Sequence, residues 1–393
     1  FFKQKTAYEI VDCDWSSDVC SSDLLHSLDS ATGPTIQLAG RTVILLASND
    51  YLGLATHPDV IQAAIRATTQ YGAGAGASRL VCGTLPPHAE LEQALADFKH
   101  TPAALIFGSG YLANLGLIPS LVARGGLIFA DRLCHASLID GARLSGADLR
   151  VYRHRDLNHL ESLLKRTRAG RPLLIMTDGL FSMDGDLAPL PELATLAERF
   201  GATLYVDDAH GTGVMGPSGR GTLEHFGIED RIPFHMGTLG KALGSSGAYI
   251  AGPTDLIQYL VSTCRPFMFT TAPAPGSAAA AHAALTVIQQ DPSRRTRLWR
   301  NRKHLFAGLT RLGFRLTESV SPILPILIGE ADNALAFSQQ LLAHGVYAPA
   351  IRPPTVPDGS SRIRVTVTAE HSPEQIDLAL GAFERAGQST RLL

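Results

Sequence analysis

The chain has 393 residues, of which 45% are hydrophobic and 18% charged, with a formal net charge of -2. This composition predicts a globular protein with a substantial core, and the near-neutral charge argues against nucleic-acid binding, which usually shows a basic excess. No apolar run approaches the roughly 20 residues that span a bilayer, and the five cysteines form neither a zinc-type spacing nor a disulfide framework, so we expect a cytoplasmic protein without a membrane partner or a metal.

The first 24 residues, Phe1–Leu24, show no sustained helical or strand period. They resemble a translated sequencing-adapter read, so we expect them to be non-native and to have displaced the true N-terminus. The pattern of the sequence changes near Asp291. We therefore predict an N-terminal segment over 25–49, a large domain over 50–290 and a small C-terminal domain over 291–393.

A glycine-rich stretch follows the first predicted strand (42–47) and helix (57–70). Gly72-Ala-Gly-Ala-Gly76-Ala fits a loose dinucleotide-binding pattern. The pattern follows a helix, whereas a dinucleotide site requires a preceding strand, so a tight-fitting flexible loop is the better interpretation.

Four predicted strands, at 103–107, 127–131, 172–178 and 203–211, are apolar runs that end in or lead into small or polar residues, and helical patterns follow. This alternation predicts an α/β protein with a mostly parallel sheet and ligand groups at the carboxyl ends of its strands. The turn Gly108-Ser-Gly110-Tyr111 leads into a helix, a geometry that offers backbone N–H groups to a phosphate. The same turn could be merely a tight connection.

The stretch Thr238-Leu-Gly-Lys241-Ala-Leu-Gly-Ser-Ser-Gly247 places a lone lysine between two apolar segments. One interpretation is an ordinary surface lysine. The other is a lysine kept for Schiff-base chemistry, because desolvation lowers the pKa of a buried amine.

A competing signal follows the fourth predicted strand. Gly211-Thr-Gly-Val-Met-Gly216 matches Gly-x-Gly-x-x-Gly, which would indicate an NAD-dependent dehydrogenase. Pro217, Gly219 and Gly221 follow directly and cannot easily open the helix that a dinucleotide site needs, so we expect no NAD site here.

The C-terminal part is predicted to be a compact α+β unit. Its basic stretch, 294–303, carries Leu298 on a core stripe with two later leucines, which favours a solvated helix face over a nucleic-acid contact. Arg352 lies between proline-fixed segments, an arrangement that suits a carboxylate, although a loop arginine paired to a surface acid is equally consistent.

Five motifs, in order and in spacing, resemble those of the α-oxoamine synthases, a family of pyridoxal-phosphate enzymes of fold type I. The motifs are Gly108-Ser-Gly-Tyr111, Asp131-x-x-x-His135-Ala-Ser, Phe181-Ser-Met-Asp-Gly-Asp186, Val206-Asp-Asp-Ala-His-Gly-Thr-Gly213 and Thr238-x-Gly-Lys241. The resemblance runs from about Leu38 to the C-terminus. It implies a mostly parallel central sheet with helices on both faces, a smaller C-terminal α+β domain, and pyridoxal 5'-phosphate as cofactor.

The resemblance also implies roles around the cofactor. Lys241 would hold it as a Schiff base and later move the Cα proton, and Asp207 would face the pyridine nitrogen, where a carboxylate keeps the ring protonated. His210 and Ser182 would reach the phenolic oxygen, and His135 would stack on the ring. The phosphate would be received by Gly110 and Tyr111 with help from Thr238, and by Thr270 or Thr271 of the neighbouring subunit of a homodimer.

On the substrate side, the resemblance implies that Arg352 binds the amino acid's carboxylate and that Thr355, Asn49 and His135 line the site. The stretches around Asn49 and Arg352 look most like the biotin-pathway branch of the family, which condenses L-alanine with pimeloyl-CoA or pimeloyl-acyl carrier protein. A relative that uses glycine or serine with another acyl-CoA remains an alternative, as does a cofactor-free binding protein.

One departure from the family concerns the acyl substrate. The family uses an arginine near the N-terminus to bind it, but no arginine precedes Arg41 in this chain. We therefore expect a chain that folds and takes up cofactor but binds its thioester poorly.

Overall fold

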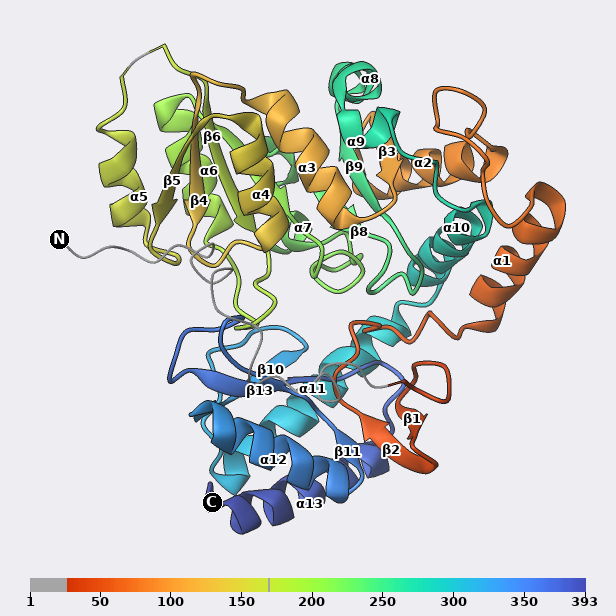
Figure 1. Cartoon of the computed structure of the whole chain (residues 1–393), viewed down its shortest axis with the longest axis vertical. Helices are drawn as coiled ribbons and strands as arrows, with labels where there is room; N and C mark the ends of the chain where they lie inside the picture. Colours follow the sequence, from red (N-terminus) through yellow and green to blue (C-terminus); the bar gives the residue numbers. More distant parts are fainter. Residues whose placement is uncertain (1–26, 169) are drawn as a thin grey trace, which may run out of the picture.

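The computed structural model describes residues 27–168 and 170–393, so the segment predicted to be non-native lies outside the described residues. The described residues form a large seven-stranded sheet and two small three-stranded sheets (Figure 1). The large sheet has the order β3-β9-β8-β7-β6-β4-β5. Its strands are β3 (Ala103–Phe107), β4 (Leu127–Asp131), β5 (Asp148–Tyr152), β6 (Leu173–Asp178), β7 (Thr203–Asp207), β8 (His235–Thr238) and β9 (Ala248–Gly252).

The prediction of a mostly parallel sheet is confirmed. All neighbouring pairs from β8 to β5 are parallel, and β9 runs antiparallel to both of its neighbours. Apart from the edge strand β5, the strands are largely buried on both faces, which explains why the sequence shows nearly continuous apolar runs rather than alternation. In β4, for example, Leu127 and Phe129 pack on one face while Ile128 and Ala130 pack on the other.

Helices cover both faces of this sheet. One face packs against α3 (Gly110–Leu121), α4 (Ala136–Ser145), α8 (Thr254–Thr263) and α9 (Arg265–Met268). The other packs against α5 (Leu157–Leu164), α6 (Leu190–Phe200), α7 (Thr222–Phe226), α2 (Pro86–Lys99) and α10 (Pro275–Gln290), and α1 (Pro58–Tyr71) packs against α10.

The C-terminal part forms a smaller unit below the large sheet in Figure 1. Its antiparallel strands are β10 (Ile323–Gly329), β13 (Ser361–Thr366) and β12 (Ala350–Ile351), and its helices are α11 (Ser293–Leu312), α12 (Ala331–Ala343) and α13 (Pro373–Thr390). The N-terminal hairpin β1 (Thr35–Leu38) and β2 (Arg41–Leu45) joins this unit, because β2 pairs in parallel with β11 (Val346–Tyr347). The domain boundaries given above stay a prediction.

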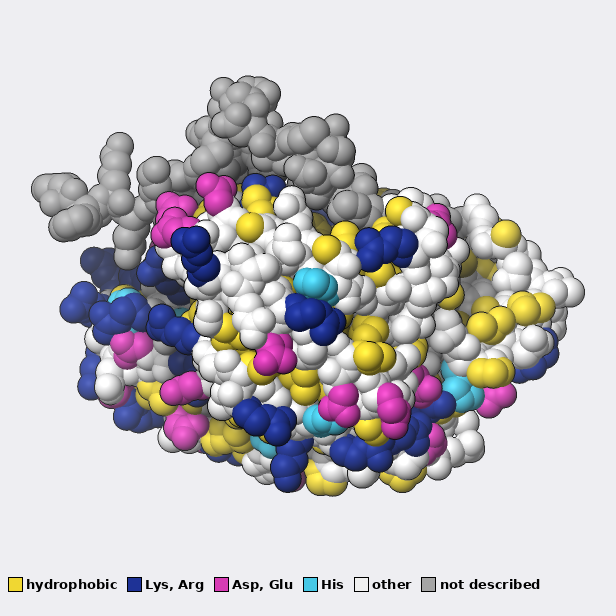
Figure 2. Space-filling view, turned by 90° about the horizontal axis from the view of Figure 1, so that it is seen from below, with side chains coloured by type: hydrophobic (Ala, Val, Ile, Leu, Met, Phe, Trp, Pro, Cys, Tyr) yellow, Lys and Arg dark blue, Asp and Glu magenta, His cyan; other side chains and the backbone are white. Residues whose placement is uncertain are grey.

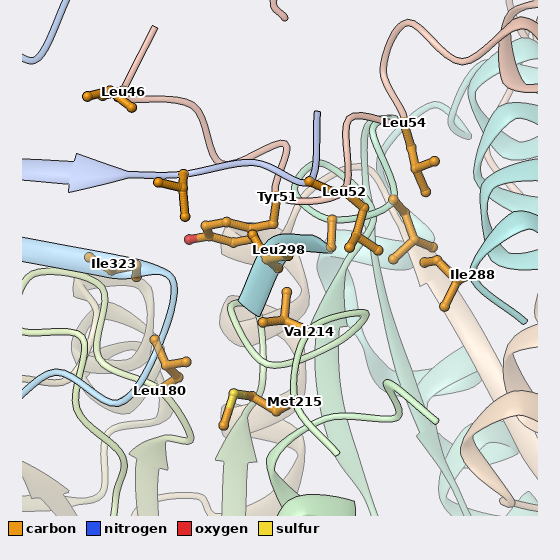
Figure 3. Close-up of a cluster of buried hydrophobic side chains, with 14 of the residues drawn as sticks. Leu46, Tyr51, Leu52, Leu54, Leu180, Val214, Met215, Ile288, Leu298 and Ile323 are labelled. Atoms are coloured by element: carbon orange, nitrogen blue, oxygen red, sulfur yellow. The ribbon is translucent and has the colours of Figure 1, made fainter. Parts of the chain in front are cut away.

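A shared apolar cluster connects the two units (Figure 3). Tyr51 and Leu52 come from the segment after β2, Val214 comes from the large unit, and Leu298 and Ile323 come from the small one. All five side chains are fully buried. The Tyr51 hydroxyl lies 2.8 Å from His210 Nδ1, just beyond the end of β7, so this cluster holds the small unit against the edge where ligand groups were expected.

The basic helix α11 uses part of its charge internally. Arg294 bonds to the Leu52 carbonyl and to Glu370, and the buried Arg295 bonds to the carbonyls of Ile288 and Pro217. The predicted core stripe is confirmed, but these two arginines do not lie on a solvated face. On the side of the molecule shown in Figure 2, cationic and anionic side chains are interspersed.

The Gly-x-Gly-x-x-Gly stretch does not open a helix. Turns follow Gly211, and the next helix, α7, is five residues long and begins only at Thr222. This geometry confirms the expectation that Pro217, Gly219 and Gly221 do not open the helix that a dinucleotide site needs. No helix among the described residues is both long and apolar enough to cross a membrane, and those residues contain no cluster of three or more metal-ligating side chains.

Candidate active site

Lys241 lies on a closed loop between β8 and β9. The loop is pinned at its base, where the Leu239 N–H donates to the Gly247 carbonyl at 2.9 Å and the Thr238 hydroxyl donates to the same carbonyl at 3.0 Å. Gly244 has a φ of 60°, and a Cβ there would lie 2.2 Å from the Ala55 nitrogen, so only glycine fits. These contacts fix the point from which the lysine side chain projects.

The Lys241 amine lies against a buried imidazole. Its Nζ is 2.8 Å from His210 Nε2, and His210 Nδ1 is 2.8 Å from the Tyr51 hydroxyl. Burial lowers the pKa of Lys241 to about 8, against the opposing pull of Asp207 and Asp178. Burial and the nearby Lys241 charge hold the pKa of His210 well below its usual value, so the ring is neutral. The pattern expected of a Schiff-base lysine is therefore present.

Asp207, at the end of β7, is buried and has a donor on each oxygen. Asn114 Nδ2 donates to Oδ2 at 2.8 Å, and the Ala209 N–H donates to Oδ1 at 3.0 Å. Asn114 is itself oriented, because it also donates to Ser137 and accepts from Tyr205. This network fixes the plane of the carboxylate. The sequence interpretation did not identify Asn114, although a fully buried asparagine within an apolar helix was a usable signal.

His135 caps α4 and is tied to two neighbours. Its Nδ1 lies 2.8 Å from the Ser137 hydroxyl, and its backbone N–H donates to Asp178 at 2.9 Å. Burial lowers the pKa of His135, although the Asp207 charge opposes the shift. Burial and the proximity of Asp207 raise the pKa of Asp178 well above its usual value. Asp178, like Ser137, was not predicted as a site residue.

Two predicted phosphate elements lie close together at the strand ends. In the sheet register Phe107, Ala248 and Thr238 are adjacent on β3, β9 and β8, so the turn after β3 and Thr238 meet at one edge. α3 begins at Gly110, with the Ser109 hydroxyl capping its first turn. A helix start offers free N–H groups to an anion. Tyr111, the next residue, bonds through its hydroxyl to Asp140.

Arg364 of the small unit reaches into the site from β13. It donates through Nε to the Ser182 carbonyl at 2.6 Å and through a terminal nitrogen to Asn49 Oδ1 at 3.1 Å. Its charge also acts on the pKa values of His210 and Lys241, lowering both, as a secondary cause after burial. The structure therefore brings Ser182 and Asn49 together at a guanidinium that the sequence interpretation missed. The strand alternation, which places two arginines on one face of β13, was the available signal.

The remaining predicted residues lie outside this network. Arg352 directly follows β12 and is half-buried, and Thr355 is exposed on the loop that leads to β13. Thr271 forms an isolated bridge with Ser78, and the Thr270 hydroxyl donates to the Pro266 carbonyl at 2.5 Å. The contacts described above for the Lys241 network do not include these four predicted residues.

The chain was compared with protein families, with curated sequences and with solved structures. The model of the aminotransferase class I and II family matches residues 41–383. An 8-amino-7-oxononanoate synthase from Anaeromyxobacter dehalogenans is 52% identical over 359 residues, which cover 91% of this chain and 90% of that one. The solved structure of a serine palmitoyltransferase from S. paucimobilis, with a bound PLP–myriocin adduct, has a TM-score of 0.92 at 35% identity over 94% of each chain. The solved 8-amino-7-oxononanoate synthase from Francisella tularensis has a TM-score of 0.76 at 28% identity, covering 88% of this chain and 98% of that one.

Proposed function

Because the chain belongs to the family of 8-amino-7-oxononanoate synthases, within the class I and II aminotransferases, we propose that it condenses L-alanine with a pimeloyl thioester. The products are 8-amino-7-oxononanoate, carbon dioxide and the free carrier, either coenzyme A or acyl carrier protein, as a step of biotin biosynthesis. The observation that carries the proposal is the contact between Lys241 and His210 beside the buried Asp207 carboxylate.

The site suits pyridoxal 5'-phosphate as its cofactor. The Lys241 amine, with its lowered pKa, is available to an aldehyde, the Asp207 carboxylate can accept from a pyridinium N–H, and the start of α3 can receive a phosphate. When bound, the cofactor supplies an electron sink for negative charge on the amino acid's Cα. His135, Ser182 and His210 are proposed to hold its ring and phenolic oxygen.

Lys241 is proposed to take the Cα proton of L-alanine. With its pKa near 8 in this environment, the amine is partly neutral close to physiological pH and can act as a base. The Tyr51 hydroxyl donates its single proton to Asn49, so it accepts the Nδ1–H of His210. The other ring nitrogen of the neutral His210, Nε2, then accepts an N–H from Lys241. The histidine thus orients the amine without competing for the proton.

Two arginines are candidates for binding the alanine carboxylate. Arg364 is mostly buried and fixed by Asn49 and the Ser182 carbonyl, so a fork is already in place within the site. Arg352 stays the candidate predicted from the sequence. Arg364→Lys and Arg352→Lys, compared for the KM of L-alanine, separate them, because the larger increase identifies the fork that binds the carboxylate.

We propose that the active form is a homodimer with shared sites. Leu80, Val81 and Phe269 are exposed hydrophobic residues, and the Ser78–Thr271 bridge joins the two segments that carry them. Burial of such a patch against a second copy would place Thr270 and Thr271 beside the neighbouring subunit, as expected for a shared phosphate site.

The direct test is product formation. Purified protein supplied with pyridoxal 5'-phosphate, L-alanine and pimeloyl-CoA should yield 8-amino-7-oxononanoate by mass spectrometry, and Lys241→Ala should yield none. A wild-type protein that binds the cofactor but makes no product from either pimeloyl carrier contradicts the proposal.

Use of serine is the second candidate. Its support is the TM-score of 0.92 to the serine palmitoyltransferase structure, against 0.76 to the solved 8-amino-7-oxononanoate synthase. The 52% identity to a synthase over most of the chain favours alanine. A panel of L-alanine, glycine and L-serine, scored by the absorbance change of the bound cofactor, distinguishes the donors.

A further inference from the structure

His154, two residues beyond the end of β5, lies between two acidic side chains from separate segments. Its Nδ1 is 2.8 Å from Asp131 Oδ1, and its Nε2 is 2.9 Å from Asp186 Oδ2. A carboxylate only accepts hydrogen bonds, so both ring nitrogens donate and the imidazole carries a positive charge. The bonds to Asp131 and Asp186 outweigh burial and raise the pKa of His154 to about 9.

The two acids belong to segments that carry predicted cofactor residues. Asp131 ends β4 and accepts from the Leu133 N–H at 2.8 Å, which shapes the turn leading to His135. Asp186 closes the segment Phe181–Leu187, here called the Ser182 loop, and the Phe181 N–H donates to its carbonyl. β5, β4 and β6 lie side by side in Figure 1, so one imidazolium ties the ends of three neighbouring strand connections.

Arg155 strengthens this attachment at a conformational cost. Its φ is 57°, a left-handed conformation that a residue other than glycine or asparagine adopts only with strain. Its backbone N–H donates to Asp131 at 2.8 Å, and its guanidinium donates to Asp186 at 3.0 Å. The cluster therefore balances two carboxylates with two cations.

From its other side, the Ser182 loop is held by the small unit. Arg362 bonds to Asp184 at 2.6 Å, the Thr317 hydroxyl donates to the Asp184 carbonyl, and the Val320 N–H donates to the Gly185 carbonyl. Arg364 bonds to the Ser182 carbonyl at 2.6 Å. The position of Arg364, which belongs to the small unit, therefore depends on the Ser182 loop of the large unit.

We propose that His154 is a positioning residue: by fixing the Ser182 loop between Asp131 and Asp186, it keeps Ser182 and the Arg364 guanidinium aligned in the active site. This inference rests on the proposed function, in which Arg364 is a candidate for binding the alanine carboxylate. It assigns to the connections that follow β4, β5 and β6 a role in amino-acid binding rather than in stability alone.

The test compares His154→Gln with His304→Gln in the loaded enzyme. His304 forms a matching 2.8 Å pair with Asp377 between α11 and α13, with no link to the Ser182 loop. His154→Gln should raise the KM for L-alanine roughly tenfold, as the loss of a charged hydrogen bond predicts, while the KM for the pimeloyl thioester stays within about twofold. His304→Gln should change neither. Equal effects of His154→Gln on both substrates, or none on L-alanine, overturn the proposal.

The pH dependence of the alanine KM distinguishes a positioning role of His154 from a purely structural one. His154 faces Asp131, Asp186 and the Arg155 guanidinium. Because it loses its proton near pH 9, the ratio of the two alanine KM values, variant over wild type, should fall toward one above that pH. Titration of L-alanine and of Lys241 is common to both proteins and cancels in the ratio. A ratio that stays constant from pH 7 to about 10 contradicts the proposal.

Two further measurements test the role of His154 if the His154→Gln variant does not fold or if the wild-type protein makes no product. If His154→Gln does not fold, Arg155→Asn, which suits the left-handed backbone, should raise the alanine KM in the same direction by less, and an unchanged KM overturns the proposal. If the wild-type protein makes no product, the proposed function fails independently. Hydrogen exchange then decides, because the Ser182 loop should exchange faster in His154→Gln than in His304→Gln, and equal exchange refutes the role of His154.

Discussion

The adjacent residues Asp207 and Asp208 point to opposite sides of β7 and meet different partners. Asp207 bonds to Asn114 and faces the site. Asp208 is fully buried, bonds to Thr222 and lies 3.9 Å from the buried Lys99 ammonium. Burial raises the pKa of Asp208 to about 6 despite that ammonium. The acid proposed to face the cofactor and an acid buried against Lys99 are therefore neighbours in the sequence.

We predict that Asp207→Asn and Asp208→Asn separate these two roles. Asp207→Asn should lower the rate of condensation by about a hundredfold or more, because the carboxylate that stabilises the ring charge is lost, with a small change in the free energy of unfolding. Asp208→Asn should lower the free energy of unfolding by about 3 kcal/mol or more, since Lys99 then lies buried without its counter-ion. Urea denaturation and steady-state kinetics of both variants measure this, and similar effects of the two on stability would contradict it.

At the scale of elements, His371 joins β2 to the end of β13. Its Nε2 lies 3.1 Å from the Leu45 carbonyl, and its Nδ1 accepts from the Thr368 N–H at 3.0 Å. Asn301 of α11 donates to the carbonyls of Thr368 and His371. The N-terminal hairpin is thus attached to the small unit by side chains as well as by its pairing with β11.

The titration of His371 predicts acid sensitivity of this joint. Burial lowers its pKa from 6.5 to about 4. Between these values the unfolded chain binds a proton on this imidazole and the folded chain does not, so the free energy of unfolding falls as the pH drops, by up to about 3 kcal/mol. His371→Gln should flatten this dependence between pH 6.5 and 4 in urea titrations. A variant whose stability falls with pH as steeply as that of the wild type would refute the assignment.

Strands with strong apolar runs were predictable from the sequence. Ala103–Phe107 and Leu127–Asp131 were predicted with the bounds that the structure shows. β5 was not predicted, because it is an edge strand with exposed and half-buried residues and lacks the continuous apolar run of its neighbours. The pairing of β2 with β11 was not accessible either, since parallel register between segments some 300 residues apart leaves no local signal.

For the candidate site, residues within compact motifs were predictable, and their supporting partners were not. Lys241, Asp207 and His210 each lie beside glycines or at a strand end that marks them. Arg364 and Asn114 act through distant partners, with separations of 315 and 93 residues from Asn49 and Asp207, so only the fold reveals them. Arg352 was favoured because its flanking prolines form a local signal, which Arg364 lacks.

At the scale of the whole molecule, exposed hydrophobic residues support the proposed homodimer. Val81 is 78% exposed and Phe269 67% exposed, on segments joined by the Ser78–Thr271 bridge. α1 also exposes Ile61 and Ile65, and Figure 2 shows hydrophobic side chains at the end of the molecule where Figure 1 places this helix. Such surfaces are costly in water unless a partner covers them.

We predict that Val81→Asp weakens self-association. A charge placed in the buried part of an interface should shift the protein toward monomers by tenfold or more in the dissociation constant, roughly 1.4 kcal/mol or above, and should lower activity at low protein concentration. Leu378→Asp, at a position on α13 that is 66% exposed, is the control. Sedimentation velocity measures both, and a Val81→Asp protein that stays as associated as the control would contradict a dimer built on this surface.

The central claim is that the Lys241 amine holds the aldehyde of pyridoxal 5'-phosphate, and borohydride reduction tests it most directly. Protein incubated with the cofactor, reduced and digested should yield one peptide carrying a phosphopyridoxyl group, on Lys241, as read by mass spectrometry. A label on another lysine, or a protein that takes up no label at all, would contradict the account.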